Sequence, residues 1–201
     1  MTSREADSLA GKSSVQRSPP RRREVSDLSA IEGWLRKSLD EKHLAREQAL
    51  TVSRVIIRLC ANAIRVIHRG ERERAEGLIE EAATKHADLS AALAPHQDIY
   101  FAGYVQDAQK ELAEAVCTAR LIFGEPLPNP SSLSIAAAPF ANGLAETVGE
   151  LRRFILDQLR QNDFSRVEAL LLQMDEIYSL LVTLDYPDGL TGGLRRSTDA
   201  A

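Results

Sequence analysis

The residues with the clearest chemical potential are three carboxylates in the stretch 104–116. Asp107, Glu111 and Glu114 follow one another at spacings of four and three residues. On a helix they project from one face, one turn above another. Like charges stacked in this way repel by roughly a few tenths of a kcal/mol per pair. A solvated helix face tolerates such a stripe, and a bound divalent cation would neutralise it, so the spacing admits both interpretations.

A second acidic set lies further along the chain, where Glu146 and Glu150 are four residues apart and Arg153 follows. Helical bundles build metal sites from carboxylates on facing helices. Hard oxygen ligands without Cys or His favour Mg²⁺ or Mn²⁺ over zinc. The chemistry that this predicts is metal-assisted phosphodiester cleavage. Glutamates at this spacing occur in most helical proteins, so the pattern alone is a weak signal.

Other kinds of active site are poorly supported by the sequence. A di-iron bundle needs Glu-x-x-His on two helices, and none of the four histidines has a glutamate three residues before it. Cys60 and Cys117 lie in apolar helical stretches, so we expect buried free thiols. The chain has neither a Gly-x-Ser-x-Gly elbow nor the lysine pattern of a phosphate-binding loop.

Arginines form a second candidate surface, on the long apolar-patterned stretch that ends at Gly70. They recur at i, i+4 spacings, so they share one helix face. Surface arginines are commonly just solvated, but a strip without acids on the same face favours phosphate binding. The residues that we expect to contact nucleic acid are Arg54, Arg58, Arg65, His68, Arg69 and Arg72.

Long helices must position these side chains. Apolar residues at spacings of three and four predict a first helix of roughly forty residues, capped by Ser26 or Asp27 and stopped by Gly70. Further helices are expected at 71–93, 99–123, 140–159 and 164–184, and residues 194–199 resemble the opening of another, so we predict an all-α bundle of about five to six long antiparallel helices. In 164–184 the expected inward residues are Val167, Leu170, Leu171, Met174, Ile177, Tyr178, Leu181 and Val182.

Composition sets the domain organisation. The 201 residues are 44% hydrophobic and 5% aromatic, with a net charge of −4, so nucleic-acid binding has to rest on local patches. We expect a disordered basic tail at residues 1–25 and one all-α domain at residues 26–201. The sequence has no apolar run near eighteen residues and no secretory signal. We therefore expect a cytoplasmic protein without a membrane partner.

Four motifs together resemble the translin and translin-associated factor X family. On the first helix, Ser53-Arg54 and His68-Arg69 stand at the family's spacing. Residues 111–116 (ELAEAV) resemble the Glu-x-x-Glu-Ala-Val core of the factor X branch, and residues 143–153 (GLAETVGELRR) resemble its Gly-Val-Ala-Asp-Leu-Thr-Gly-Glu-Leu-x-Arg motif. The tail, residues 184–199, is similar to prokaryotic members. The resemblance covers about residues 27–199.

The resemblance implies an all-α fold that assembles into hollow oligomers and binds single-stranded RNA or DNA. The factor X branch cuts RNA with Mg²⁺, and its catalytic carboxylates fall on Glu111, Glu114 and Glu146. The family has aspartate at position 146, and the longer glutamate puts this third ligand in doubt because Mg²⁺ tolerates little distortion. Glu150 is a further member of the catalytic set, as a ligand or a base, or else the ion-pair partner of Arg153. The arginine strip resembles the family's nucleic-acid surface.

We therefore expect a translin-like homo-oligomer that binds single-stranded RNA or DNA and acts as a Mg²⁺-dependent (or Mn²⁺-dependent) endoribonuclease. Two alternatives stay open. In one, the protein binds single strands without cleaving them and its acids face water. In the other, it is a helical interaction scaffold with no measurable affinity for single strands.

Overall fold

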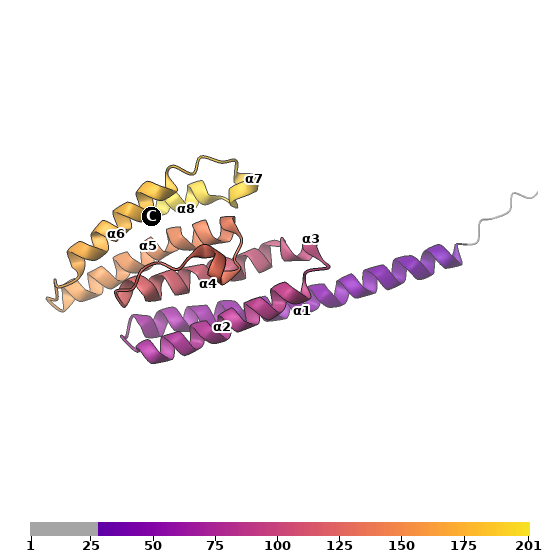
Figure 1. Cartoon of the computed structure of the whole chain (residues 1–201), viewed down its shortest axis with the longest axis horizontal. Coiled ribbons are helices and arrows are strands. Elements are labelled where there is room, and N and C mark those ends of the chain that lie inside the picture. Colours follow the sequence, from indigo (N-terminus) through magenta and orange to yellow (C-terminus); the bar gives the residue numbers. More distant parts are fainter. Residues whose placement is uncertain (1–27) are drawn as a thin grey trace, which may run out of the picture.

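The structure is a computed structural model that describes residues 28–201, and every regular element in this range is a helix (Figure 1). Five helices have fifteen residues or more, which confirms the predicted all-α bundle. Their bounds are α1 Ser29–Ile67, α2 Arg72–Ala92, α4 Gly103–Ile122, α5 Ala137–Arg160 and α6 Val167–Leu181. The short elements are α3 Gln97–Tyr100, the 3₁₀ turn Pro130–Leu133, α7 Asp188–Thr191 and α8 Leu194–Ala200. The predicted tail at residues 1–25 lies outside the described range.

Helix α4 is the centre of the bundle. It packs against α1 and α2 on one side and α5 on the other, and α6, α7 and α8 cover the far side of α5 (Figure 1). Both clusters of buried apolar residues include side chains of α4: Leu112 belongs to the cluster shared with α1 and α2, and Leu121 to the one shared with α5 and α6. Four alanines of α4 are buried, which lets its neighbours approach closely. The carboxylates of α4 are therefore carried by a helix with little free surface.

A close helix–helix contact fixes α5 against α4. A Cβ added at Gly143 of α5 would lie 2.9 Å from the Glu114 nitrogen and 2.8 Å from the Ala113 Cβ, so only glycine fits there. Gly143 therefore serves close packing. Gly149, on the same helix, is exposed and has no atom within 4 Å of an added Cβ.

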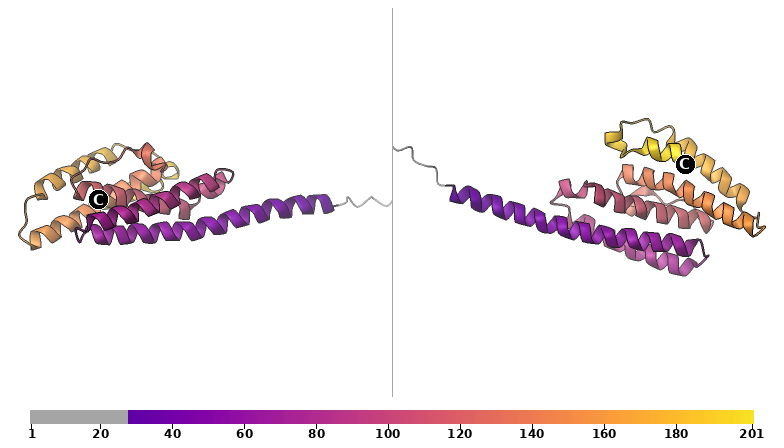
Figure 2. Two further views of the ribbon diagram at one scale, coloured as in Figure 1. Left: turned by 60° about the horizontal axis from the view of Figure 1, so that its bottom comes forward. Right: turned by 180° about the vertical axis from the view of Figure 1, so that it is seen from behind.

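The first half of α1 extends beyond the rest of the bundle (Figure 2). Helix α1 runs without a break through Gly33 and ends where Gly70 adopts φ 75°, as the sequence predicted. Its second half packs on α2 and α4. In the first half, every residue from 28 to 44 is exposed. Its exposed apolar residues are Leu28, Ile31, Trp34, Leu35, Leu39 and Leu44.

Helix α6 is shorter and less buried than predicted. It begins at Val167 because Asp163 accepts the Ser165 backbone N–H in a turn before the helix, rather than capping the helix itself. Of the eight residues expected to face inward, Leu170, Ile177 and Leu181 are buried. The prediction was wrong for Leu171, Tyr178 and Val182, which are exposed, because α6 packs mainly on α5.

Two further boundaries differ from the prediction. The expected helix 99–123 is divided into α3 and α4, because the chain is extended at Ala102. Between the expected helices at 164–184 and 194–199 the chain also forms the short helix α7. None of the helices in residues 28–201 is long and apolar enough to cross a bilayer.

Candidate functional site

Three glutamates converge between α4 and α5. Glu111 and Glu114 come from α4 and Glu146 from α5, and one oxygen of each lies within 4.8 Å of the others. These are the three residues that the family resemblance implied as metal ligands. Asp107, the first carboxylate of the α4 stripe, is exposed and does not join them. The stripe therefore divides into one solvated acid and two that face α5.

Glu114 is the most buried member of the cluster, with 8% of its surface exposed. Burial raises the pKa of its carboxyl to about 8, and the charges of Glu146, Glu111 and Glu150 act in the same direction, while Lys110 opposes them. Burial disfavours the ionised form, and nearby negative charges disfavour it further. A cation among these carboxylates would reverse the effect.

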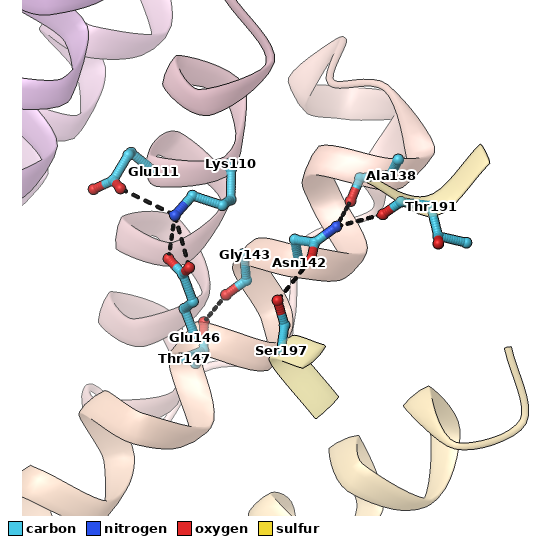
Figure 3. Close-up of polar contacts among 9 residues, drawn as sticks. All are labelled: Lys110, Glu111, Ala138, Asn142, Gly143, Glu146, Thr147, Thr191 and Ser197. Carbon is cyan, nitrogen blue, oxygen red and sulfur yellow. Dashed lines mark hydrogen bonds and ion pairs between the residues drawn. The ribbon is translucent and has the colours of Figure 1, made fainter. Parts of the chain in front are cut away.

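A lysine already occupies part of this cluster. The Lys110 Nζ lies 2.7 Å from both carboxylate oxygens of Glu146 and 3.3 Å from Glu111 Oε1 (Figure 3). Burial pulls the pKa of Lys110 down, but its bonds to Glu146 and the charge of Glu111 outweigh this, and the net pKa is raised. Lys110 is thus the positive partner that two of the three glutamates share.

Glu150 lies one turn after Glu146 and has a partner that sequence reasoning missed. Its Oε2 is 2.5 Å from His68 Nε2 at the end of α1 and 3.5 Å from a terminal nitrogen of Arg153. The hydrogen bond from His68 is the main reason that the pKa of Glu150 is held below its usual value. A signal for this contact was present, because His68 follows the buried residues Cys60 and Ile64 at steps of four.

The His68 side chain is only 6% exposed. It was expected among the residues that contact nucleic acid, but its ring points from α1 toward α5. Its Nδ1 is buried without a partner among the described residues. The position of His68 suits the orientation of Glu150 better than contact with a strand.

Three arginines of α1, Arg54, Arg58 and Arg65, lie on the face opposite to its buried residues. They are exposed, as is Arg69 in the turn that follows α1. Arg54 and Arg58 form no ion pair with any residue in 28–201, and Arg65 donates a hydrogen bond to Asn62 rather than to an acid. Arg69 lies 3.9 Å from a carboxylate oxygen of Glu71. This face therefore presents positive charge that the rest of the described chain leaves largely unneutralised.

Arg72 differs from the other arginines in its surroundings. It begins α2, pairs with Glu76 at 2.7 Å and with Glu125, and its guanidinium lies 5.2 Å from the centre of the Phe123 ring. These contacts with Glu76 and Glu125 raise the pKa of Arg72. They also offset its charge, so Arg72 adds less to the basic face than its place in the sequence indicated.

The two cysteines of α1 and α4 are buried free thiols, as predicted. Burial raises the pKa of Cys60 and of Cys117 to about 12. Neither thiol is a nucleophile at neutral pH, because the thiolate is the reactive form.

Comparison with known proteins gives the family. None of the known family models matches the chain. Uncharacterized protein MJ0175 of Methanocaldococcus jannaschii is 31% identical over 168 residues, which are 83% of this chain and 74% of that protein. The structure of AfC3PO in a complex with duplex RNA superposes with a TM-score of 0.80 at 35% identity, covering 85% of this chain and 88% of the other. The chain belongs to the translin-like C3PO family.

Two further C3PO structures agree with this assignment. A crystal structure of AfC3PO has a TM-score of 0.77 at 34% identity, with 85% of this chain and 88% of the other covered. The structure of apo-NeC3PO has a TM-score of 0.76 over 87% of this chain and 91% of the other. At 16% identity this last likeness shows the fold alone. The translin-like fold expected from the four sequence motifs is therefore confirmed.

Proposed function

We propose that this translin-like protein is a homo-oligomer that binds single-stranded RNA or DNA and cleaves RNA with Mg²⁺ or Mn²⁺. The observation that carries the proposal is the convergence of Glu111, Glu114 and Glu146 from two helices within 4.8 Å. Such an arrangement costs free energy unless a cation offsets the repulsion. In a helical bundle it is also the usual way to build a carboxylate metal site.

The donor set fits Mg²⁺ or Mn²⁺. All three groups are hard oxygen ligands, and the described residues of the cluster include no thiolate or imidazole. Glu114 supports the assignment, because its carboxyl has a raised pKa and lies among acids rather than beside a positive partner of its own. The longer side chain at position 146 still brings its carboxylate into the cluster. The glutamate that replaces the family's aspartate is thus compatible with a third ligand.

A divalent ion held here would stabilise the charge that develops on a scissile phosphate and would make a bound water more acidic. Glu111, Glu114 and Glu146 would hold the ion. Glu150 stays ionised at neutral pH because His68 bonds to it, so its carboxylate can accept a hydrogen bond from an attacking water. A low pKa makes Glu150 a weak general base, and we assign it the orientation of water.

The exposed arginines of α1 would hold the strand. Arg54, Arg58 and Arg65 are exposed and lack an acidic partner within the described range, whereas the His68 side chain is buried. Arginine contacts to phosphates position a strand without reading its sequence. AfC3PO, 35% identical to this chain, is known in a complex with duplex RNA, which supports RNA as the ligand class here.

Exposed apolar side chains support association of copies. They lie along the free half of α1 and on α6, where Leu171, Leu172 and Leu180 face outward. Exposed apolar side chains that gather on one helix face are typical of interaction sites.

Cleavage of a labelled single-stranded RNA, with Mg²⁺ and with EDTA, tests the proposal. We expect cleavage in Mg²⁺ that EDTA abolishes. Glu111→Ala and Glu114→Ala should abolish cleavage while RNA binding is kept. Glu81→Ala, which removes an exposed acid of α2, is the control and should cut like the wild type.

The other outcomes point to the two alternatives. RNA that stays intact but shifts in a gel would mean a binding protein without catalysis. Cleavage that survives Glu114→Ala would remove the site that we assign. The absence of any shift or cleavage at moderate salt, with single-stranded or duplex RNA, would favour the scaffold.

A further inference from the structure

Lys110 occupies the place where positive charge is needed in the acidic cluster. Its Nζ contacts both oxygens of Glu146 at 2.7 Å and Glu111 Oε1 at 3.3 Å, so two of the three proposed ligands already bind a cation supplied by the chain (Figure 3). We propose that Lys110 is a built-in competitor of the divalent ion: the ion enters by displacing the ammonium group from Glu146 and Glu111. This inference rests on the metal site of the proposed function.

The geometry makes simultaneous occupancy unfavourable. Mg²⁺ binds oxygen at about 2.0–2.1 Å and demands near-octahedral geometry. Both Glu146 oxygens are engaged by the ammonium, which points at the carboxylate symmetrically. An ion bound to either oxygen would lie within a few ångströms of the positive nitrogen. The two cations would repel strongly in this half-buried place.

The surroundings of Lys110 leave room for it to move. Its side chain is 22% exposed, and it lines a groove of about 990 Å³ beside the cluster. The exposed carboxylate of Asp107, one helical turn earlier, lines the same groove and offers an alternative partner. A four-carbon side chain can turn from the cluster into this groove without any change in the backbone. Displacement is therefore open to Lys110, whereas Glu114 is buried and fixed.

Competition from Lys110 lowers the affinity of the site for the divalent ion by the free energy of the lysine contacts with Glu146 and Glu111. It also couples ion binding to movement of Lys110, because occupation of the site would release the ammonium group into the groove beside the proposed reaction centre. A lysine with a purely structural role would stay on Glu146 whether or not an ion is bound. Metal affinity and the accessibility of Lys110 are therefore the two quantities that separate these roles.

Metal affinity is measured by calorimetric titration of the chelator-treated full chain with Mn²⁺. Lys110→Met keeps the length of the side chain and removes its charge, and we expect it to bind Mn²⁺ at least fivefold more tightly than the wild type. Lys85→Met is the matched control, since Lys85 pairs with Glu81 on the exposed face of α2, and its affinity should equal that of the wild type. Equal or weaker Mn²⁺ binding by Lys110→Met would overturn the inference and leave the metal site in place.

The movement of Lys110 is measured on the wild type, which avoids any folding defect of a variant. Brief acetylation followed by mass spectrometry gives the reactivity of each lysine with and without Mg²⁺. We expect Lys110 to react at least threefold faster in Mg²⁺, while Lys85 is unchanged. Unchanged or slower reaction of Lys110 would overturn the inference.

The two experiments also separate this inference from the proposed function. Mn²⁺ binding by Lys110→Met but not by the wild type would support competition in its strongest form. Failure of both proteins to bind Mn²⁺ would remove the metal site, and the inference with it.

Discussion

Gly143 of α5 lies so close to Lys110 of α4 that an added Cβ would stand 2.5 Å from the Lys110 carbonyl oxygen. Real Cβ atoms essentially never approach a backbone atom this closely, so a larger residue would force the two helices apart. These helices carry all three glutamates of the cluster. The contact therefore sets the distance across which Glu146 meets Glu111 and Glu114.

Gly143→Ala should destabilise the protein by roughly 2–3 kcal/mol, because overpacking against backbone can be relieved only by shifting a helix. The measurement is the free energy of unfolding in denaturant. Gly149→Ala is the control on the same helix, since its added Cβ meets nothing within 4 Å. That change should stabilise by about 0.5–1 kcal/mol, the usual gain of replacing glycine by alanine in a helix. Equal effects of the two substitutions would mean that the helices are not packed as described.

The raised pKa of Glu114 predicts how stability changes with pH in EDTA. In the unfolded chain this carboxyl ionises near pH 4.5, but in the folded protein it keeps its proton up to about pH 8. Between these values the folded state binds more protons than the unfolded state, so the free energy of unfolding falls as pH rises and levels off above about pH 8. Glu114→Gln should remove this decline and exceed the wild type by more than about 1 kcal/mol at pH 8. The exposed Glu176→Gln is the control and should keep the wild-type profile.

The same carboxyl couples metal binding to proton release. An ion can use Glu114 as a ligand only after its proton has left. We expect Mn²⁺ affinity to rise as pH increases from about 6 to the pKa near 8, and binding at pH 7 to release up to about one proton. Calorimetry in buffers of different ionisation enthalpy measures that proton. Binding without proton release would mean that Glu114 is ionised already or is no ligand.

Substitution of His68 should change the pKa of Glu150 and leave RNA affinity nearly unchanged. His68→Gln removes the imidazole that holds the pKa of Glu150 down, so the pKa of Glu150 should rise, as measured by NMR titration of its carboxyl carbon. RNA affinity should stay within about twofold, because the His68 side chain is almost fully buried. A large loss of RNA affinity with no change at Glu150 would return His68 to the nucleic-acid surface.

The sequence predicted the helices and the acidic residues better than it predicted which surfaces pack together and which side chains the glutamates contact. Apolar spacing located α1, α2, α4 and α5, because α2, α4, α5 and the second half of α1 each pack an apolar stripe against neighbours in the same chain. It failed on α6, where Leu171 and Tyr178 continue the apolar pattern but are exposed. A pattern records that a face is apolar, and does not record whether the same chain covers it.

The site shows the same limit. The acidic set around Glu111 and the one around Glu146 could be predicted because spacings of three and four residues are local. The family motifs then indicated that the two sets form one site. The contacts that tune them join distant residues: His68 meets Glu150 across 82 positions, and Lys110 meets Glu146 across 36. Such contacts depend on the crossing of helices, which spacing along one helix does not fix. Only the steps of four from Cys60 through Ile64 to His68 indicated that the histidine faces inward.

The exposed arginines of α1 should determine how RNA binding depends on salt. Removing one arginine that neutralises a phosphate should reduce the slope of log K against log salt by about 0.7 for a single strand. We expect Arg54→Ala and Arg58→Ala each to weaken binding of a labelled single-stranded RNA and to reduce this slope by about that amount. Arg160→Ala is the control, because Arg160 is also exposed but pairs with Asp157 at the end of α5. An unchanged slope in the Arg54 and Arg58 variants would place the strand on another face, and an equal reduction in Arg160→Ala would mean that binding follows net charge alone.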